Sequence, residues 1–354
     1  YKDAALLSPT QASSKKSANK EETKMKTILN RAVGGFFSSV ACVAIACSLA
    51  TSAFASEWPQ QPVRLVVPFA AGGATDIISR VLAQELGNAW KQTVVVENKV
   101  GAGGAVGASQ VARAKPDGYT MLMISGSMFT VNPYLYKKLP YSVADFQPVS
   151  IVTTGPLLLA VNKNVPASNL KTFLEYAKKN GTATNFGSAG VGSQGHMASE
   201  AIMNATDATM THIPYGGESA ALTDLVAGQI QVITANLSAT LPFVRSGDIK
   251  ALAVTGDKRS RSLPDVPSVQ EQLGSDFDVV GWFGIVVPKN TPEQVVSRIE
   301  EGIKKAIASS RMTQKFAELG LEQAATGAAY MNDRVKDESV FWKKIIAEQK
   351  IESK

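Results

Sequence analysis

Two patterns of apolar residues alternate along the chain and predict its elements. Short, nearly continuous apolar runs favour buried strands, and apolar residues that recur every three or four positions favour helices. The predicted strands are 63–67, 93–97, 119–124, 149–161, 183–189, 208–215, 230–236, 249–256 and 279–287. The predicted helices are 76–90, 104–114, 168–180, 194–204, 218–228, 292–309 and 329–348. Continuous apolar strands separated by helices favour parallel sheets that are covered on both faces.

The same pattern indicates how the domains are organised. We find no internal repeat and no Gly/Ser-rich linker, so two domains in tandem are not expected. The runs 149–161 and 279–287 are the best candidates for strands that cross between two domains. We therefore predict an α/β fold of two domains with a hinge of crossing strands. Residues 56–156 plus 283–354 would form the first domain, and residues 157–282 an inserted second domain. Ligands of such folds bind beyond the carboxyl ends of the strands and between domains.

The first 55 residues have a different composition from the rest of the chain. Residues 1–24 are polar, rich in Ser and Lys and without periodicity, and we interpret them as a disordered or non-native leader that precedes a start at Met25. Positive residues then precede an apolar stretch at 33–49, and Ala53-Phe54-Ala55 fits a cleavage site. This order predicts a signal peptide at 25–55, cleaved near Ala55, and a periplasmic mature protein.

Two alternatives to a cleaved signal peptide are weaker. The apolar stretch at 33–49 is about long enough to span a membrane, but it contains Gly34, Gly35, Ser38 and Ser39 and ends in the cleavage pattern. Cys47 is preceded by Ala44-Ile45-Ala46, which matches a lipoprotein signal poorly. Export with cleavage remains the prediction.

Composition and charge exclude several classes of function. Both cysteines lie before residue 56, so the mature chain has no disulfide, no thiolate nucleophile and no cysteine-bound metal. Residues 1–55 carry seven Lys/Arg and three Asp/Glu, so the net charge of +6 falls to +2 for residues 56–354. Without a basic face we predict no nucleic-acid partner. The only histidines, His196 and His212, lack zinc-ligand spacing, so we expect no metal and no cofactor.

Four loops rich in small residues follow predicted strands: the first at 69–76, the second at 125–130, the third at 187–194 and the fourth at 215–218. The first, third and fourth also open a helix, where unpaired N–H groups and the positive end of the helix dipole attract anions. Charge-assisted hydrogen bonds contribute about 1.5–3 kcal/mol each. Hydroxyl donors are available on Thr75, Ser127, Ser188 and Ser193. Glycine-rich turns also occur simply because chains must turn, so a carboxylate site needs two such loops, one from each domain.

Other residues in these loops leave alternatives open. Asp76 has the wrong charge for an anion site, so we expect it in the first helical turn with Arg80 at i+4 as its partner. It could instead cap loop amides or hold an ordered water. His196 and His212 could flank a pocket, but a buried histidine in packing contact is the commoner case. Gly190-x-Gly192-x-x-Gly195 matches a dinucleotide fingerprint only formally, because the acidic residue about 20 positions on is missing.

No pattern in the sequence predicts an enzyme. There is no GxxxxGK[ST] or GxSxG motif, and nothing in the sequence ties a histidine to a serine nucleophile. We therefore expect a protein without catalytic residues.

Several long segments resemble one family. The chain contains WPQQPVRLVVPFAAGGATDIISRVLAQEL, VVENKVGAGGAVGASQVARAKPDGYTML, GSAGVGSQGHMASE, HIPYGG, ALTDLVAGQIQV, IKALAVTGDKRSRSLPDVPSV and GWFGIVVPKNTP. These segments are similar to those of the tripartite tricarboxylate transporter receptors, also called Bug proteins. The resemblance covers nearly the whole mature chain.

The resemblance implies a type II periplasmic-binding-protein fold whose two domains close on a small organic carboxylate. In this family the loop after the first strand and its counterpart in the second domain grip one carboxylate through backbone N–H groups, hydroxyls and ordered water. Together with the loops above, it gives the expected ligand-binding residues: Phe69, Ala71, Gly72, Gly73, Thr75, Asp76, Ser127, Thr130, Ser188, Ser193, His196, Tyr215, Gly217 and Asn236.

The chain also departs from the family pattern. Many members have Pro-Gly-Gly where this chain has Ala71-Gly72-Gly73, and relatives often carry an acid in the region 234–236, where this chain has Thr-Ala-Asn. An acid there could engage a ligand amine, so its absence favours a plain carboxylate over an amino acid as the ligand.

The expected ligand is a tricarboxylate, a dicarboxylate or an aromatic carboxylate. The implied partners are the membrane permease subunits of a tripartite tricarboxylate transporter, with a sensor kinase as the alternative. We expect the receptor to be a monomer.

Overall fold

The computed structural model describes residues 58–274 and 277–352, and every element below belongs to one compact unit, residues 59–354. Its strands are β1 Val63–Val67, β2 Val94–Asn98, β3 Thr120–Ser125, β4 Phe146–Asn162, β5 Asn185–Ser188, β6 Thr211–Pro214, β7 Val232–Asn236, β8 Ile249–Val254, β9 Val280–Pro288 and β10 Glu322–Gly327. Its α-helices are α2 Ala74–Trp90, α3 Ala105–Ala112, α4 Ser127–Thr130, α5 Asn132–Leu135, α6 Leu170–Asn180, α7 Gln194–Thr206, α8 Glu218–Ala227, α9 Leu237–Ser246, α10 Val269–Leu273, α11 Glu293–Ile307, α12 Ser310–Leu319 and α13 Ala328–Glu348. Short 3-10 turns lie at Ala102–Gly104, Val143–Asp145 and Gly181–Ala183.

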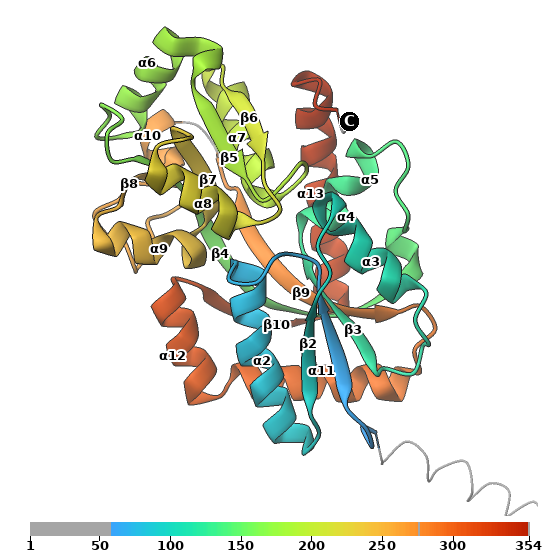
Figure 1. The fold of residues 1–354 in the computed structure, drawn as a ribbon. Coiled ribbons are helices and arrows are strands. Elements are labelled where there is room, and N and C mark those ends of the chain that lie inside the picture. The colour runs from blue at the N-terminus through green and yellow to red at the C-terminus, as the bar shows by residue number, and fades with distance from the viewer. Residues whose placement is uncertain (1–57, 275–276, 353–354) are drawn as a thin grey trace, which may run out of the picture. The chain divides into compact units, whose positions relative to one another are not determined.

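The strands are hydrogen-bonded in the order β2-β1-β3-β9-β4-β7-β5-β6, and β8 and β10 also pair with β4. We call the part built on β1, β2, β3 and β10 the first lobe, and the part built on β5, β6, β7 and β8 the second lobe. The 17-residue strand β4 belongs to both, because Phe146–Pro156 pairs with β9 and Leu157–Asn162 pairs with β7 and β8. Figure 1 shows β4 and β9 running together between the lobes. The predicted α/β fold with crossing strands is therefore observed.

The direction of the crossing strands differs from the prediction. Strand β1 is parallel to β2 and β3, and β5 is parallel to β6 and β7, as expected. Strand β9, however, is antiparallel to β3 and β4, and β4 is antiparallel to β7, β8 and β10. A continuous apolar run reports burial on both faces of a sheet and not the direction of its neighbours. The prediction of parallel sheets is therefore confirmed for β1, β2 and β3 and for β5, β6 and β7, and is wrong for β4 and β9.

Each face of the sheet is covered by apolar packing. In the first lobe Val66, Leu122 and Ile124 pack with Trp282 and Val286 of β9. In the second lobe one cluster lies under α6 and α7 and another under α8 and α9. Trp342, Ile345 and Ile346 of α13 join the cluster under α7. Each large apolar side chain that is fully buried contributes about 1.5–3 kcal/mol, so these clusters hold the strand ends, and the loops that follow them, in place.

Several elements were not predicted, namely α4, α5, α9, α10, α12 and β10. Helix α9 starts immediately after β7, with Asn236 as its N-cap, and contains Pro242, so its pattern does not separate from that of the strand. Helix α2 starts at Ala74 rather than 76. The first loop is therefore shorter than expected, and Thr75 and Asp76 belong to the first helical turn.

Within residues 58–274 and 277–352, no helix has the length and apolar character needed to cross a membrane. The predicted leader at 1–24 and signal peptide at 25–55 lie outside the described residues.

Candidate functional site

Four helices begin around one small cavity between the lobes, which we call the inner chamber. Its volume is about 30 Å³. It is lined by Phe69, Ala70, Gly73, Ala74, Thr75, Ser125, Ala189, Ser193, Gln194, Gly195, Gly217, Glu218, Asn236 and Phe283. Each of α2, α7, α8 and α9 contributes its N-cap residue to this lining, and α2, α7 and α8 also contribute their first helical residue. The arrangement follows from topology, because the loops after β1, β5, β6 and β7 all open toward this point.

The inner chamber has the character of an anion site. A helix start presents backbone N–H groups that have no partner inside the helix, together with the positive end of the helix dipole. Among the lining residues that the structure describes there is no Lys, Arg or His. Since one water-sized site needs about 10–15 Å³, the chamber offers room for two such sites. That matches the two oxygens of a single carboxylate group.

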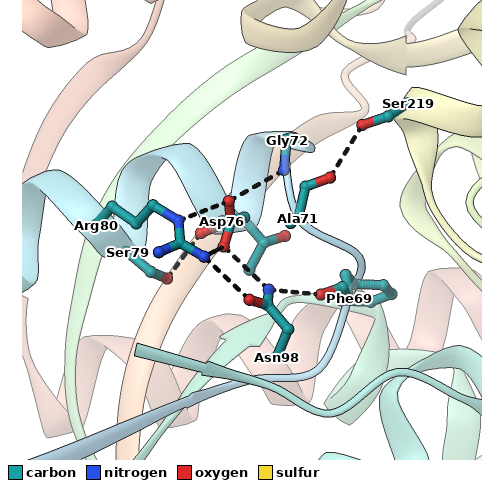
Figure 2. Close-up of polar contacts among 9 residues, drawn as sticks. Phe69, Ala71, Gly72, Asp76, Ser79, Arg80, Asn98 and Ser219 are labelled. Carbon is teal, nitrogen blue, oxygen red and sulfur yellow. Dashed lines mark hydrogen bonds and ion pairs between the residues drawn. The ribbon is translucent and has the colours of Figure 1, made fainter. Parts of the chain in front are cut away.

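Asp76 fixes the shape of the first loop, as Figure 2 shows. Its Oδ2 accepts hydrogen bonds from the Gly72 backbone N at 3.0 Å and from Arg80 Nε at 2.9 Å. Its Oδ1 accepts one from Asn98 Nδ2 at 2.9 Å, and the same Asn98 Nδ2 donates to the Phe69 carbonyl oxygen at 2.9 Å. We call Phe69, Gly72, Asp76, Arg80 and Asn98 the Asp76 clasp. It ties both ends of the loop to the end of β2 and to the first turn of α2.

The charge of Asp76 is balanced inside the clasp. Burial alone would raise the pKa of this carboxyl, but hydrogen bonds from Arg80, Gly72 and Asn98 outweigh burial and hold the pKa below its ordinary value. The predicted i+4 ion pair with Arg80 is confirmed, with Arg80 Nη2 at 2.9 Å from Oδ1. The alternative role, capping a loop amide, is present as well. Asp76 does not line the inner chamber.

The fourth loop of the second lobe lies directly against the first loop of the first lobe. A Cβ added to Gly217 would come within 2.9 Å of the Ala70 Cβ, so only glycine allows this approach. Ser219 Oγ on α8 donates to the Ala71 carbonyl oxygen at 3.4 Å. Elsewhere between the lobes, Tyr136 Oη donates to the Val191 carbonyl oxygen at 3.0 Å. The lobes thus contact each other beside the inner chamber and again at Tyr136 and Val191.

Glu218 places a carboxylate inside this anion chamber, which the sequence did not lead us to expect. The residue is 8% exposed. Its Oε1 accepts hydrogen bonds from the Asn236 backbone N at 2.9 Å and from Asn236 Nδ2 at 2.6 Å. Its Oε2 accepts one from the Ala74 backbone N of the other lobe at 3.3 Å. Burial raises the pKa of Glu218, and the hydrogen bonds from Asn236 and Ala74 only partly oppose this rise.

A larger cavity of about 540 Å³, which we call the outer cavity, adjoins the inner chamber and shares Phe69 and Ala189 with it. Its wall is formed by residues 100–104 and Tyr136 of the first lobe, by 189–191, His212 and 214–216 of the second lobe, and by Pro68 and Glu352. This size is within the range of about 300–1,000 Å³ that is usual for small-molecule sites. Tyr215 lies in this wall, and its hydroxyl donates to Asp224 Oδ2 at 2.8 Å.

Ser188 and His212 are in hydrogen-bond contact, with 2.6 Å between Ser188 Oγ and His212 Nε2. His212 stacks on His196 at 3.9 Å and on Phe186 at 4.8 Å between ring centroids. Burial and the neighbouring His196 lower the pKa of His212 to about 3, so its ring is neutral and binds a proton weakly. A general base works best with a pKa near the working pH. A ring with so low a pKa is a poor general base for Ser188, and the pair packs with Phe186 and His196 behind the third loop.

The structure brings six of the expected residues together around the inner chamber: Phe69, Gly73, Thr75, Ser193, Gly217 and Asn236. Tyr215 lies at the outer cavity. The remaining seven line neither cavity: Ala71, Gly72, Asp76, Ser127, Thr130, Ser188 and His196.

The polar groups among those seven bond elsewhere. Ser127 Oγ lies 3.1 Å from Ser125 Oγ, and Thr130 Oγ1 donates to the Gly126 carbonyl oxygen at 3.1 Å. Buried His196 accepts a hydrogen bond at Nδ1 from the Gly192 backbone N at 3.1 Å. No group of three or more His, Cys, Asp or Glu able to hold a metal occurs in the described part of the chain.

Sequence reasoning missed two residues that organise the site. Glu218 is the last residue of the fourth loop, but only Tyr215 and Gly217 of that loop were predicted to bind the ligand. Asn98 ends β2 and braces the first loop from a distance of 29 residues along the chain. The only feature of the sequence that could have identified Asn98 is that it is a polar residue at the carboxyl end of a strand that neighbours β1.

Comparison with known proteins agrees with this geometry. Residues 78–351 match the family model described as the tripartite tricarboxylate transporter family receptor. The chain belongs to this family. Its fold is accordingly that of a periplasmic binding protein, and the family is a class of solute-binding receptors rather than enzymes.

Three solved structures are similar over most of the chain. The periplasmic binding protein BugD is 34% identical with a TM-score of 0.80, and the match covers 84% of this chain and 100% of BugD. The R. palustris protein Rpa4515, solved with adipate, is 31% identical with a TM-score of 0.81, covering 83% and 99%. MatC from Rhodopseudomonas palustris, solved with bound malate, is 29% identical with a TM-score of 0.77, covering 82% and 100%.

Proposed function

We propose that this protein is an extracytoplasmic receptor that captures a small organic carboxylate between its two lobes for a tripartite tricarboxylate-type transporter. The observation that carries this proposal is the inner chamber, where the starts of α2, α7, α8 and α9 surround a space the size of one carboxylate group without any basic side chain. Backbone N–H groups and the Ser193 and Thr75 hydroxyls are the donors available to hold a carboxylate there.

The outer cavity would hold the rest of the ligand. Adipate and malate, the ligands of two similar structures, are small dicarboxylates, so the class of ligand fits one carboxylate in the inner chamber and a short body beyond it. His212 is the one histidine in the outer cavity wall, and no Lys or Arg is found among the described residues there. Glu352 is an acid in the same wall and would repel a second carboxylate, so the far end of the ligand would be bound by neutral polar groups or face water.

We further propose that residues 157–282 act as an inserted domain that closes on the ligand by bending at β4 and β9. A ligand stabilises a closed state only through its stronger binding to that state. The closed receptor would present a surface to the permease subunits, and a sensor kinase is the alternative partner of the same binding unit. The protein would act as a periplasmic monomer after cleavage of residues 25–55 near Ala55, without a cofactor and without turnover of its ligand.

A thermal-shift screen of residues 56–354 tests the proposal. The panel contains citrate, C4 to C6 dicarboxylates, aromatic carboxylates and acidic amino acids. A ligand at 100 times its dissociation constant adds about 2.7 kcal/mol to the free energy of unfolding, enough to raise Tm by several degrees. One clear hit, returned unchanged after incubation, supports a carboxylate receptor. A flat panel together with no ligand in mass spectra of the denatured protein contradicts it.

A further inference from the structure

The inner chamber already contains one carboxylate, that of Glu218. Its Oε1 is held by two donors of Asn236, at 2.9 and 2.6 Å. Its Oε2 accepts only the long hydrogen bond of 3.3 Å from the Ala74 backbone N and lies 4.0 Å from the position that a Cβ on Gly73 would take. The oxygen with free acceptor capacity is therefore the one that faces the first loop. This is the position where a ligand carboxylate would meet α2.

Among the residues that the structure describes, no cation lies beside Glu218 to balance its charge. In the described part of the chain, no other ionisable side chain lines the inner chamber. The charged groups of the elements packed around it are engaged elsewhere. On α2, Asp76 pairs with Arg80, and on α7, His196 Nε2 lies 3.4 Å from Glu200 Oε1. On α8, Asp224 accepts from Tyr215, and on α9, Arg245 lies in the last turn, away from the N-cap.

A second carboxylate in a space of about 30 Å³ creates a conflict of charge. Two carboxylates in contact cannot both stay ionised away from water, and one proton shared between them removes the repulsion. Expulsion of Glu218 would break its two short hydrogen bonds to Asn236 and leave those buried donors unpaired.

We propose that Glu218 takes up one proton from solvent when a ligand carboxylate enters the inner chamber, and that this proton then joins the two carboxyl groups in a hydrogen bond. The inference rests on the proposed function. The charges balance as follows: one ionised ligand carboxylate and the Glu218 carboxylate combine with one proton, and this pair of carboxyl groups carries one net negative charge instead of two. The Ala74 N–H, released from Oε2, becomes a donor to the ligand.

Because burial already raises the pKa of Glu218 in the free protein, the coupling has a defined pH window. Below the free-protein pKa, Glu218 is protonated in both states and binding takes up no proton. Between that pKa and the higher pKa in the complex, binding takes up one proton and the affinity falls tenfold for each unit of rising pH. Above the second pKa the affinity is again constant at its low value.

Isothermal titration calorimetry measures this coupling. A carboxylate hit from the panel is titrated into residues 56–354 between pH 5 and 9, at each pH in buffers of different ionisation enthalpy, which gives the number of protons bound. We expect an uptake that rises toward one proton within the window. The variant Glu218→Gln keeps the shape of the side chain and donates a hydrogen bond like the protonated acid. It should bind the ligand without proton uptake, and its affinity should not fall tenfold for each unit of rising pH. The matched control Glu200→Gln, on α7 outside the chamber, should behave like the unmodified protein.

The possible results separate the two proposals. Binding without proton uptake at every pH, or uptake that persists in Glu218→Gln, overturns the role of Glu218 and leaves the receptor function intact. Preferential binding of aspartate or glutamate without uptake, lost in Glu218→Gln, would assign Glu218 to a ligand amine and also overturn it. No binding of any carboxylate contradicts the proposed function itself. Should Glu218→Gln fail to fold, infrared difference spectra of the unmodified protein decide the matter, since a protonated carboxyl band must appear on binding.

Discussion

Gly73 is the residue at which the size of the inner chamber can be tested directly. Its backbone is extended, with φ −80° and ψ 170°, so other residues can adopt it. A Cβ would lie 3.7 Å from the Ala70 carbonyl oxygen and 4.0 Å from Glu218 Oε2, which is ordinary contact. We predict that Gly73→Val keeps the fold but abolishes carboxylate binding, because its methyl groups fill the chamber.

The control for this prediction is Gly73→Ala, which adds the Cβ alone and should bind measurably better than Gly73→Val. Calorimetric titration gives the affinity and thermal melting the fold. Equal affinity of Gly73→Val and the unmodified protein would place the ligand somewhere other than the inner chamber.

Ser193 has two separable roles at the residue scale. Its Oγ caps α7 by accepting from the His196 backbone N at 3.3 Å, and it lines the inner chamber, where its proton can bond a ligand. We predict that Ser193→Ala loses about 0.5–2 kcal/mol of stability as a lost cap and about 1–3 kcal/mol of binding free energy as a lost hydrogen bond. Urea unfolding and calorimetric titration measure the two losses.

Ser309→Ala is the matched control, because Ser309 caps α12 in the same way, with Oγ accepting from the Met312 backbone N at 3.2 Å, but does not line the chamber. It should lose stability and keep its affinity. Ser188→Ala should also keep its affinity, since that hydroxyl bonds His212. An unchanged affinity in Ser193→Ala would leave ligand binding to backbone N–H groups.

At the scale of elements, the Asp76 clasp connects β1, β2 and α2, and its contribution depends on pH. The pKa of Asp76 is lower in the folded protein than its ordinary value of 3.8. The clasp therefore stabilises the fold fully above the unfolded pKa, and this stabilisation is lost as the pH falls through the folded pKa. We predict that Asp76→Asn is less stable than the unmodified protein at pH 7 and that the difference shrinks below pH 4, as measured by urea unfolding.

The variant Asn98→Ala tests the order of the first loop separately from the charge of Asp76. It removes the hydrogen bonds from Asn98 to Asp76 and to the Phe69 carbonyl oxygen but leaves the ion pair between Asp76 and Arg80. It should speed hydrogen exchange at the Gly72 amide and weaken binding.

A stability difference for Asp76→Asn that stays constant from pH 7 to pH 3 would show that charge does not act through this clasp.

The sequence predicted elements more reliably than the contacts between their ends. Long apolar runs identified β4 and β9 as crossing strands, since burial on both faces is a local property of the residues. Their antiparallel direction depends on neighbours far away in the chain and left no local signal. Likewise, a small-residue loop before a helix pointed to Thr75 and Ser193, and both residues line the inner chamber. The role of Ser188 was decided by His212, 24 residues later, and the position of Glu218 by the start of α9.

At the scale of the whole binding unit, we expect the proposed closure to depend on how closely the fourth loop can approach the first. Gly217 has extended backbone, with φ 169° and ψ 166°, so a side chain there strains nothing locally. The obstacle is the Ala70 Cβ, 2.9 Å from where a Cβ on Gly217 would lie. The neighbouring Gly216 differs, because its added Cβ would meet only Val100 Cγ1 at 3.9 Å. These two adjacent glycines therefore give a matched pair for testing closure.

We predict that Gly217→Leu holds the lobes apart, so that a ligand that compacts the unmodified protein no longer changes the radius of gyration in small-angle X-ray scattering. Gly216→Ala should compact like the unmodified protein. Because the ligand stabilises closure only through its stronger binding to the closed state, Gly217→Leu should also bind more weakly. Full compaction of Gly217→Leu with ligand would mean that the fourth loop can retract from Ala70. The contact between the two loops would then follow from closure and would not limit it.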